Sequence, residues 1–95
     1  MGYCCVKALV SGKVQGVWYR RSTQEQAQKV GVTGYAINLP DGRVEVLMCG
    51  DRAQVNKLSE WLWEGPERAR VSRVELAPVE LDSAGAPEPD SFTTG

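Results

Sequence analysis

The segment from Gly12 to Arg20 (GKVQGVWYR) carries the residue types best suited to binding an anion. It lies between a predicted strand and the start of a predicted helix, where unpaired backbone N–H groups and the helix dipole favour negative charge. Gly16 allows the backbone to turn closely around a phosphate, and Arg20 offers a planar set of donors that matches phosphate oxygens. Because a cation opposes the dipole at a helix N-terminus, a purely structural role explains Arg20 poorly. The segment therefore predicts a phosphate site.

Several other kinds of site find no support in the sequence. The segment has neither the GxxxxGK[ST] nor the GxGxxG pattern, so nucleotide binding is not implied. The chain has no histidine, which removes the commonest general base at neutral pH, the Ser-His and Cys-His nucleophile pairs and the commonest zinc ligand. Its three cysteines show no CxxC spacing. We therefore expect no metal and no cofactor.

Hydrophobic periodicity predicts the elements that position this segment. Residues 4–10 alternate with period two and form a strand, and residues 11–16, which include two glycines, form a loop. The helix that follows ends at Gly31, and its inward positions recur at helical spacing: Tyr19, Thr23, Ala27 and Val30. The predicted phosphate site is thus a strand-to-helix loop.

The second half of the chain supplies two more strands, a helix and a last strand. Residues 32–38 and 43–49 are strands, and the Pro-Asp-Gly turn between them makes them a hairpin. A second helix is capped by Asp51 and stops at Gly65, and residues 71–79 form a strand whose proline suits a sheet edge.

The predicted order is strand, helix, strand, strand, helix, strand. Two right-handed crossovers in this order give a ferredoxin-like α+β sandwich (βαββαβ), an antiparallel sheet with two helices on one face. We assign residues 1–80 to this domain and residues 81–95 to a C-terminal tail. A short edge strand near Phe92 is the one element considered for that tail.

Length and charge limit the class of protein. Ninety-five residues fit one domain. The net charge of -1, from 11 Lys and Arg against 12 Asp and Glu, lacks the basic excess typical of nucleic-acid binding. No apolar run approaches the roughly 18 residues of a membrane span, and the first residues show no signal-peptide pattern. We expect a cytoplasmic monomer that binds neither nucleic acid nor membrane.

Cys5 and Cys49 are expected to meet in this fold. The first and third strands are antiparallel neighbours, so the start of one meets the end of the other, and both cysteines share parity with polar residues of their strands. They should lie on the open face of the sheet, away from the helices, where the geometry allows a cross-strand disulfide. A reducing cytoplasm opposes such a bond, and the sequence leaves both states open.

Two sets of residues resemble the acylphosphatase family. The first matches its G-x-V-Q-G-V-x-[FY]-R element at Gly12, Val14, Gln15, Gly16, Val17, Tyr19 and Arg20. The second matches G-aromatic-small-x-N-x-x-x-G-x-V with a later glycine, at Gly34, Tyr35, Ala36, Asn38, Gly42, Val44 and Gly50. The resemblance spans roughly residues 5–80. Ile37 replaces the basic or polar residue usual in the family, and residues 91–95 look shorter than its closing strand.

The resemblance implies hydrolysis of acyl phosphates, which are carboxyl-phosphate mixed anhydrides, to a carboxylate and inorganic phosphate. It implies that Arg20 and the loop N–H groups bind the phosphoryl group and that Asn38 orients the attacking water. The loop residues concerned are Gln15, Gly16, Val17, Trp18, Tyr19 and Arg20. A chain without histidine can run this reaction, because a carboxylate leaving group with a pKa of about 4 to 5 needs no general acid. We expect a small-molecule substrate, with inorganic phosphate or sulfate as a competing ligand.

Two other functions use the same loop or the same fold. A non-catalytic phosphate or carbamoyl-phosphate binding module has no need to orient water, so Asn38 discriminates between this alternative and the enzyme. An RNA-binding sheet needs exposed aromatic residues on its central strands, and the strands predicted here expose none. Trp18 is interpreted either as a core anchor or as a wall of the acyl pocket, and Arg21 as a solvated helix charge.

Overall fold

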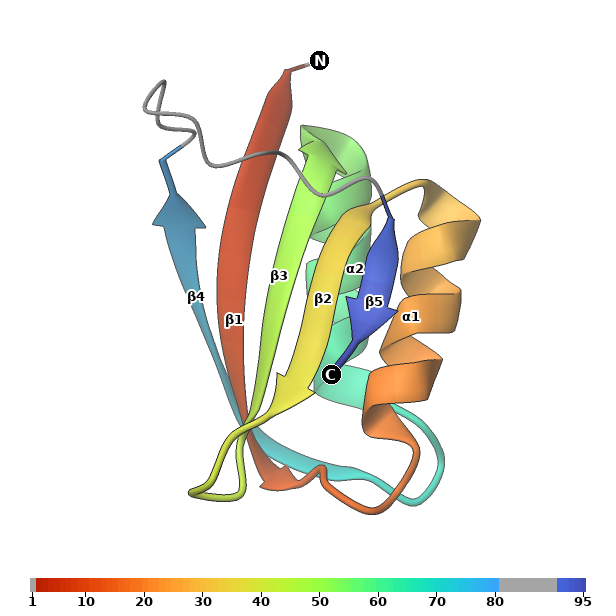
Figure 1. Cartoon of the computed structure of the whole chain (residues 1–95), viewed down its shortest axis with the longest axis vertical. Helices are drawn as coiled ribbons and strands as arrows, with labels where there is room; N and C mark the ends of the chain where they lie inside the picture. The colour runs from red at the N-terminus through yellow and green to blue at the C-terminus, as the bar shows by residue number, and fades with distance from the viewer. Residues whose placement is uncertain (1, 81–90) are drawn as a thin grey trace.

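The computed structural model describes residues 2–80 and 91–95 and has the predicted ferredoxin-like fold (Figure 1). The elements are β1 (Tyr3–Lys13), α1 (Tyr19–Val30), β2 (Thr33–Asn38), β3 (Val44–Asp51), α2 (Arg52–Glu64), β4 (Arg70–Val79) and β5 (Phe92–Thr94). The strands form one sheet in the order β4-β1-β3-β2-β5, and both helices pack on one of its faces. β5 pairs parallel with β2 while the other neighbours are antiparallel, so the sheet is mixed rather than purely antiparallel.

The hydrophobic core lies between the sheet and the helices. On the helix side, β1 and β3 present buried apolar side chains at alternate positions, and α2 covers them with side chains spaced three and four residues apart. The residues are Ala8, Val10, Val44, Val46, Met48, Val55, Leu58 and Leu62. Burying one such valine, leucine or methionine contributes about 1.5–3 kcal/mol, so this layer holds the strands that carry the site.

Local signals define both helices as predicted. α1 ends at Gly31, whose φ of 74° is left-handed and favours glycine. α2 begins after Asp51, whose carboxylate accepts a hydrogen bond of 3.0 Å from the Ala53 N–H. The Tyr19 hydroxyl donates to the Leu62 carbonyl at 2.6 Å and ties the start of α1 to the end of α2. Within the described residues, neither helix has the length and apolar character needed to cross a membrane.

β1 is longer than predicted. The sequence ends this strand at Val10, but its pairing with β4 continues to Lys13, with a shift of register between Ser11 and Gly12. Gly12 has a φ of 121°, and a Cβ at this position would overlap the Arg70 carbonyl oxygen. The glycine expected to begin the loop therefore admits a close approach of β4, and the loop is correspondingly shorter.

β5 lies beside β2 at the edge of the sheet (Figure 1). The Gly34 N–H donates to the Ser91 carbonyl at 3.0 Å, and the Gly95 N–H donates to the Ala36 carbonyl at 3.1 Å. Phe92 is buried, with 3% of its surface exposed, and joins the core cluster. Residues 81–90 of the predicted tail lie outside the described residues.

Cys5 and Cys49 face each other on β1 and β3 and form a disulfide, with their Cα atoms 4.1 Å apart. Strand alternation places both on the face opposite the helices, and both are buried there, at 5% and 1% exposure. Cys4 is free. The bond joins the start of β1 to the end of β3, whereas the predicted phosphate loop follows the other end of β1.

Reduction of the Cys5–Cys49 disulfide is expected to lower the free energy of unfolding by about 3–4 kcal/mol, because the bond closes a long loop in the unfolded chain. Turnover should change little, since the bond lies far along β1 from the loop. Thiol titration of the unreduced, denatured protein should find one thiol, from Cys4. Three titratable thiols would show that the bond does not form, and a Cys5→Ser/Cys49→Ser variant provides the one-thiol reference.

Candidate active site

The loop between β1 and α1 is anchored in the core by three of its side chains. Val14, Val17 and Tyr19 are buried, whereas Gly16 and Trp18 between them are exposed. Gly16 and Trp18 both adopt left-handed backbone conformations, with φ of 74° and 65°. Left-handed residues in such a loop turn successive N–H groups toward one concave side, which is the geometry of an anion site. Apolar anchoring thus presents the backbone of residues 14–19 in a fixed shape.

The N–H groups of this loop have no partners in the described part of the chain. None from residues 15–18 donates a hydrogen bond there, and no side chain caps α1 at Trp18. A Cβ built on Gly16 meets nothing within 4 Å, so the backbone at this residue borders open space. Because unpaired donors at a helix start attract anions, the loop has the chemistry predicted for binding a phosphoryl group.

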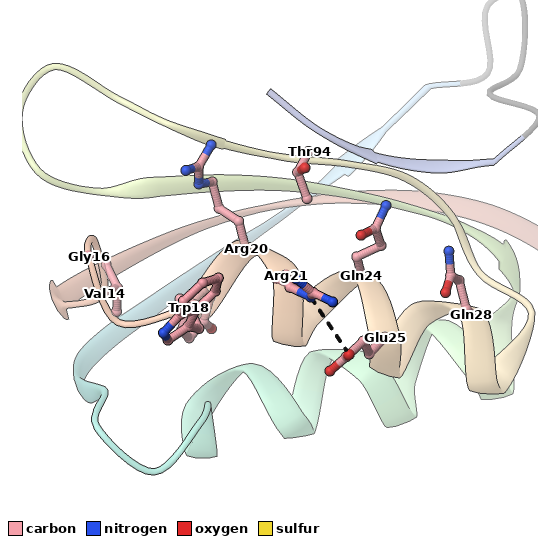
Figure 2. Close-up of a pocket in the computed structure, with 10 residues that line it drawn as sticks. Val14, Gly16, Trp18, Arg20, Arg21, Gln24, Glu25, Gln28 and Thr94 are labelled. Atoms are coloured by element: carbon pink, nitrogen blue, oxygen red, sulfur yellow. Dashed lines mark ion pairs between the residues drawn. The ribbon is translucent and has the colours of Figure 1, made fainter.

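Arg20 points from the first turn of α1 toward the end of the chain (Figure 2). Its Nη1 donates to the backbone oxygen of Gly95, which is itself bound to β2 through the Ala36 carbonyl. Nearby on α1, the Gln24 side chain donates to the Phe92 carbonyl at 2.8 Å. The segment of β5 and Gly95 is therefore attached to the start of α1 through both Arg20 and Gln24.

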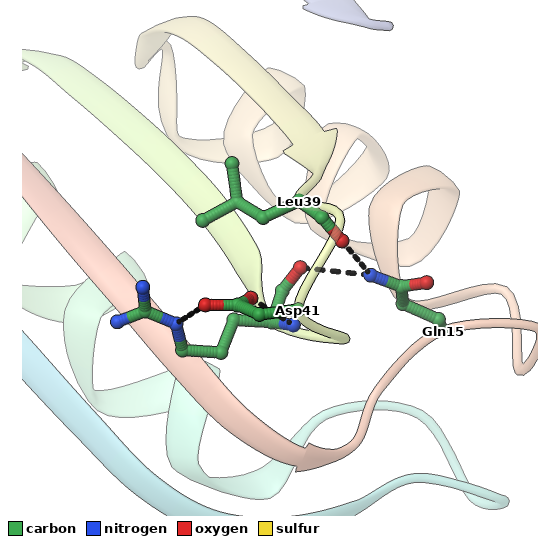
Figure 3. A network of polar contacts seen from close by, with 4 residues as sticks. Gln15, Leu39 and Asp41 are labelled. Carbon is green, nitrogen blue, oxygen red and sulfur yellow. Dashed lines mark hydrogen bonds and ion pairs between the residues drawn. The ribbon is translucent and has the colours of Figure 1, made fainter.

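Gln15 joins the loop to the hairpin of β2 and β3 (Figure 3). Its Nε2 donates to the carbonyl oxygens of Leu39 and Arg43, each at 2.9 Å. The same turn is braced by Asp41, which accepts from the backbone N–H of Arg43 at 3.1 Å and pairs with its guanidinium at 2.8 Å. The backbone hydrogen bond from Arg43 is the main cause that lowers the pKa of Asp41. The side-chain role of Gln15 was not predicted, because no spacing in the sequence reports its distant carbonyl partners.

Asn38 is the last residue of β2 and is exposed. Alternation along the strand puts it on the same side as the buried Ala36, which faces the helices. Ala36 also accepts the hydrogen bond from Gly95, the residue that Arg20 contacts, so Asn38 and Arg20 approach the same end of β5. The side-chain hydrogen bonds found among the described residues include none from Asn38, which leaves its amide available to a water or ligand.

A groove of about 700 Å³ extends from the loop along α1 (Figure 2). Trp18 lines it with 70% of its surface exposed, so its interpretation as a core anchor is wrong. Arg21 is exposed and lies 4.0 Å from Glu25 in a solvated ion pair, as expected for a helix surface charge. Arg20 and Gly16 line the groove, whereas Asn38 is not among its lining residues. The structure thus brings Arg20 and the loop together in one groove, and Asn38, at the end of β2, does not line it.

The sequence matches the model of the acylphosphatase family over residues 6–92. The chain belongs to the acylphosphatase family. It is 50% identical over 91 residues to an acylphosphatase of Chromohalobacter salexigens, and the match covers 96% of both chains. It is 59% identical over 75 residues to an acylphosphatase of Hahella chejuensis, and that match covers 79% of this chain and 80% of the other. A solved acylphosphatase structure from Coxiella burnetii superposes with a TM-score of 0.89 at 38% identity, covering 98% of this chain and 93% of that one.

Membership of the acylphosphatase family makes the chain a hydrolase that acts on acyl phosphates. The resemblance carried by the two sequence motifs is therefore confirmed. Hydrolysis of an acyl phosphate requires that a phosphoryl group is bound and that water is brought to it.

Proposed function

We propose that this acylphosphatase binds the phosphoryl group of its substrate with Arg20 and the loop N–H groups and directs water to it with Asn38. The observation that carries the proposal is the loop itself. Gly16 and Trp18 are left-handed, the N–H groups of residues 15–18 have no partner among the described residues, and Gly16, Trp18 and Arg20 line one groove. An array of fixed donors beside one guanidinium is complementary to the three oxygens of a phosphoryl group.

Positioning and electrostatics supply most of the catalysis in this proposal. Phosphoryl transfer passes through a transition state whose charge spreads over three equatorial oxygens, so donors already aimed at those oxygens need no reorganisation. The buried anchors Val14, Val17 and Tyr19 keep the loop in that shape before substrate arrives. Gln15 holds the loop to the hairpin that carries Asn38, which fixes the phosphoryl group relative to the water.

The bond changes balance without a protein acid or base. The water oxygen forms a bond to phosphorus, the bond from phosphorus to the acyl oxygen breaks, and the carboxylate leaves with the electron pair. A carboxylate with a pKa of about 4 to 5 departs unprotonated at neutral pH. Asn38 is not a base, so the water proton passes to a phosphoryl oxygen, and the amide acts by holding the water in line with the breaking bond.

Hydrolysis is expected to be independent of divalent metal. Arg20 and the loop N–H groups already supply the positive potential that a metal would otherwise provide. Phosphate release from acetyl phosphate should therefore be unchanged by excess EDTA, and inorganic phosphate or sulfate should inhibit competitively by occupying the loop. A requirement for added magnesium would contradict the proposal. Noncompetitive inhibition by phosphate would place the anion site elsewhere.

We extend the proposal to the oligomeric state, the class of substrate and the cellular location of the chain. One chain supplies the loop, Arg20 and Asn38, so we expect a monomer acting on a small-molecule acyl phosphate, without nucleic acid or membrane. We also retain the cytoplasm as its location. Fractionation of cells that express the protein, with sizing of the purified chain, tests both expectations.

A further inference from the structure

The groove is much longer than a phosphoryl group requires. From Trp18 to Gln28 it follows ten residues of chain along α1, which is about 15 Å of helix. The phosphoryl group proposed above occupies only the end at Gly16 and Arg20. The remaining length is therefore free to hold the acyl part of a substrate whose phosphoryl group binds at that end.

Trp18, which lines the groove next to Gly16 and Arg20, has an unfavourable backbone conformation and an exposed side chain. Its φ of 65° is left-handed, a conformation that glycine or asparagine adopts at lower cost than a bulky residue. Its side chain is 70% exposed although both chain neighbours, Val17 and Tyr19, are buried. A strained backbone and an exposed aromatic ring beside a reaction site together suggest a role in ligand binding.

Arg21 supports the indole from the helix. Its guanidinium carbon lies 6.0 Å from the centre of the Trp18 ring, in range of a cation–π contact, and Glu25 holds the guanidinium from the other direction at 4.0 Å. Figure 2 shows Trp18, Arg21 and Glu25 along one side of the groove, with Arg20 and Thr94 toward the strands. Trp18 and Arg21 both line the groove, so the flat apolar ring borders it next to the guanidinium.

We propose that Trp18 determines specificity for the acyl group, by forming a flat wall that favours acyl phosphates with an aromatic or other planar apolar substituent over acetyl phosphate. This inference rests on the proposed placement of the phosphoryl group at the loop. The acyl carbon is joined to the phosphoryl group through one oxygen. The substituent on that carbon therefore begins within a side-chain length of Trp18. Stacking on the indole adds binding that a methyl group cannot obtain.

Two non-hydrolysable analogues test the wall without depending on catalysis. In benzoylphosphonate and acetylphosphonate the acyl carbon is bonded directly to phosphorus, so both can be titrated against the protein by calorimetry. The wild-type chain should bind benzoylphosphonate roughly 10-fold more tightly than acetylphosphonate.

Trp18→Ala should bring this ratio of affinities close to one. Trp18→Asn should do the same while tolerating the left-handed backbone. Trp63→Ala, which removes a tryptophan exposed at 54% on α2, is the matched control and should keep the ratio.

An unchanged ratio of benzoylphosphonate to acetylphosphonate affinity in both Trp18 variants would overturn the inference. A loss of inorganic phosphate affinity in both variants would also overturn it, because the ring would then support the phosphate loop itself. Hydrolysis of benzoyl and acetyl phosphate is measured on the same samples. Normal hydrolysis with an unchanged ratio defeats only the specificity role. A ratio that falls as expected in the Trp18 variants, while the wild-type chain hydrolyses neither substrate, defeats the proposed catalytic roles and leaves the specificity role of Trp18 intact.

Discussion

Arg20→Gln is expected to lower kcat for acetyl phosphate by about 10³- to 10⁵-fold, the range that an arginine contributes when it stabilises the transition-state charge of a transferring phosphoryl group in GTPases. The guanidinium is proposed to contact the phosphoryl oxygens both before and during the reaction. Losing hydrogen bonds from a charged donor should therefore also weaken the binding of inorganic phosphate, by roughly 10- to 100-fold. Steady-state kinetics and phosphate titration on the same preparation measure both effects.

Two further substitutions separate charge, geometry and nonspecific effects at Arg20. Arg20→Lys keeps the charge but loses the planar set of donors, so it should recover only part of the lost phosphate affinity. Arg52→Gln removes an exposed arginine at the start of α2, at the end of β3 away from the loop, and should change kcat by no more than about 2-fold. Equal losses in Arg20→Gln and Arg52→Gln would mean that overall charge rather than the site is responsible.

Asn38→Ala is expected to lose about 100- to 1000-fold in kcat, the typical cost of removing one positioned hydrogen bond in the transition state. The Asn38 amide is exposed and has no partner among the described side chains, so its removal should leave the fold intact. Phosphate affinity should stay within a few-fold of wild type, because the amide is proposed to contact only the water. Single-turnover kinetics with acetyl phosphate measure the chemical step directly.

Asn56→Ala, on the exposed face of α2, is the matched control for Asn38→Ala and should keep normal kcat. Thermal unfolding of each variant separates a catalytic loss from a loss of fold. Near-normal turnover in Asn38→Ala would show that the water-orienting role is wrong and that another group directs the attack.

The strands and helices that position the site could be predicted from sequence because their signals are local. The helical spacing from Tyr19, the stop at Gly31 and the turn before Arg43 each depend on neighbouring residues, and the structure has these elements where expected. The phosphate loop is predictable for the same reason. Its glycine, its arginine and the helix that follows lie within a few residues of one another.

The features that escaped prediction depend on contacts between distant residues. Gln15 bonds to carbonyl groups 24 and 28 residues away, and a backbone carbonyl gives no signal in a sequence. The contact between Arg20 and Gly95 spans 75 residues and depends on a strand of three residues, which is too short for periodicity to show. Trp18 was ambiguous because an aromatic residue between buried neighbours is compatible with either side of a loop, until the left-handed backbone turns it outward.

The division of labour between Arg20 and Asn38 is tested most directly by titrating inorganic phosphate into wild type, Arg20→Gln and Asn38→Ala by calorimetry, with kcat measured on the same samples. We expect both variants to be strongly impaired in turnover, Asn38→Ala to bind phosphate within a few-fold of wild type, and Arg20→Gln to bind it roughly 10- to 100-fold more weakly. A loss of phosphate affinity in Asn38→Ala as large as in Arg20→Gln would place Asn38 among the phosphoryl-binding groups and contradict the account.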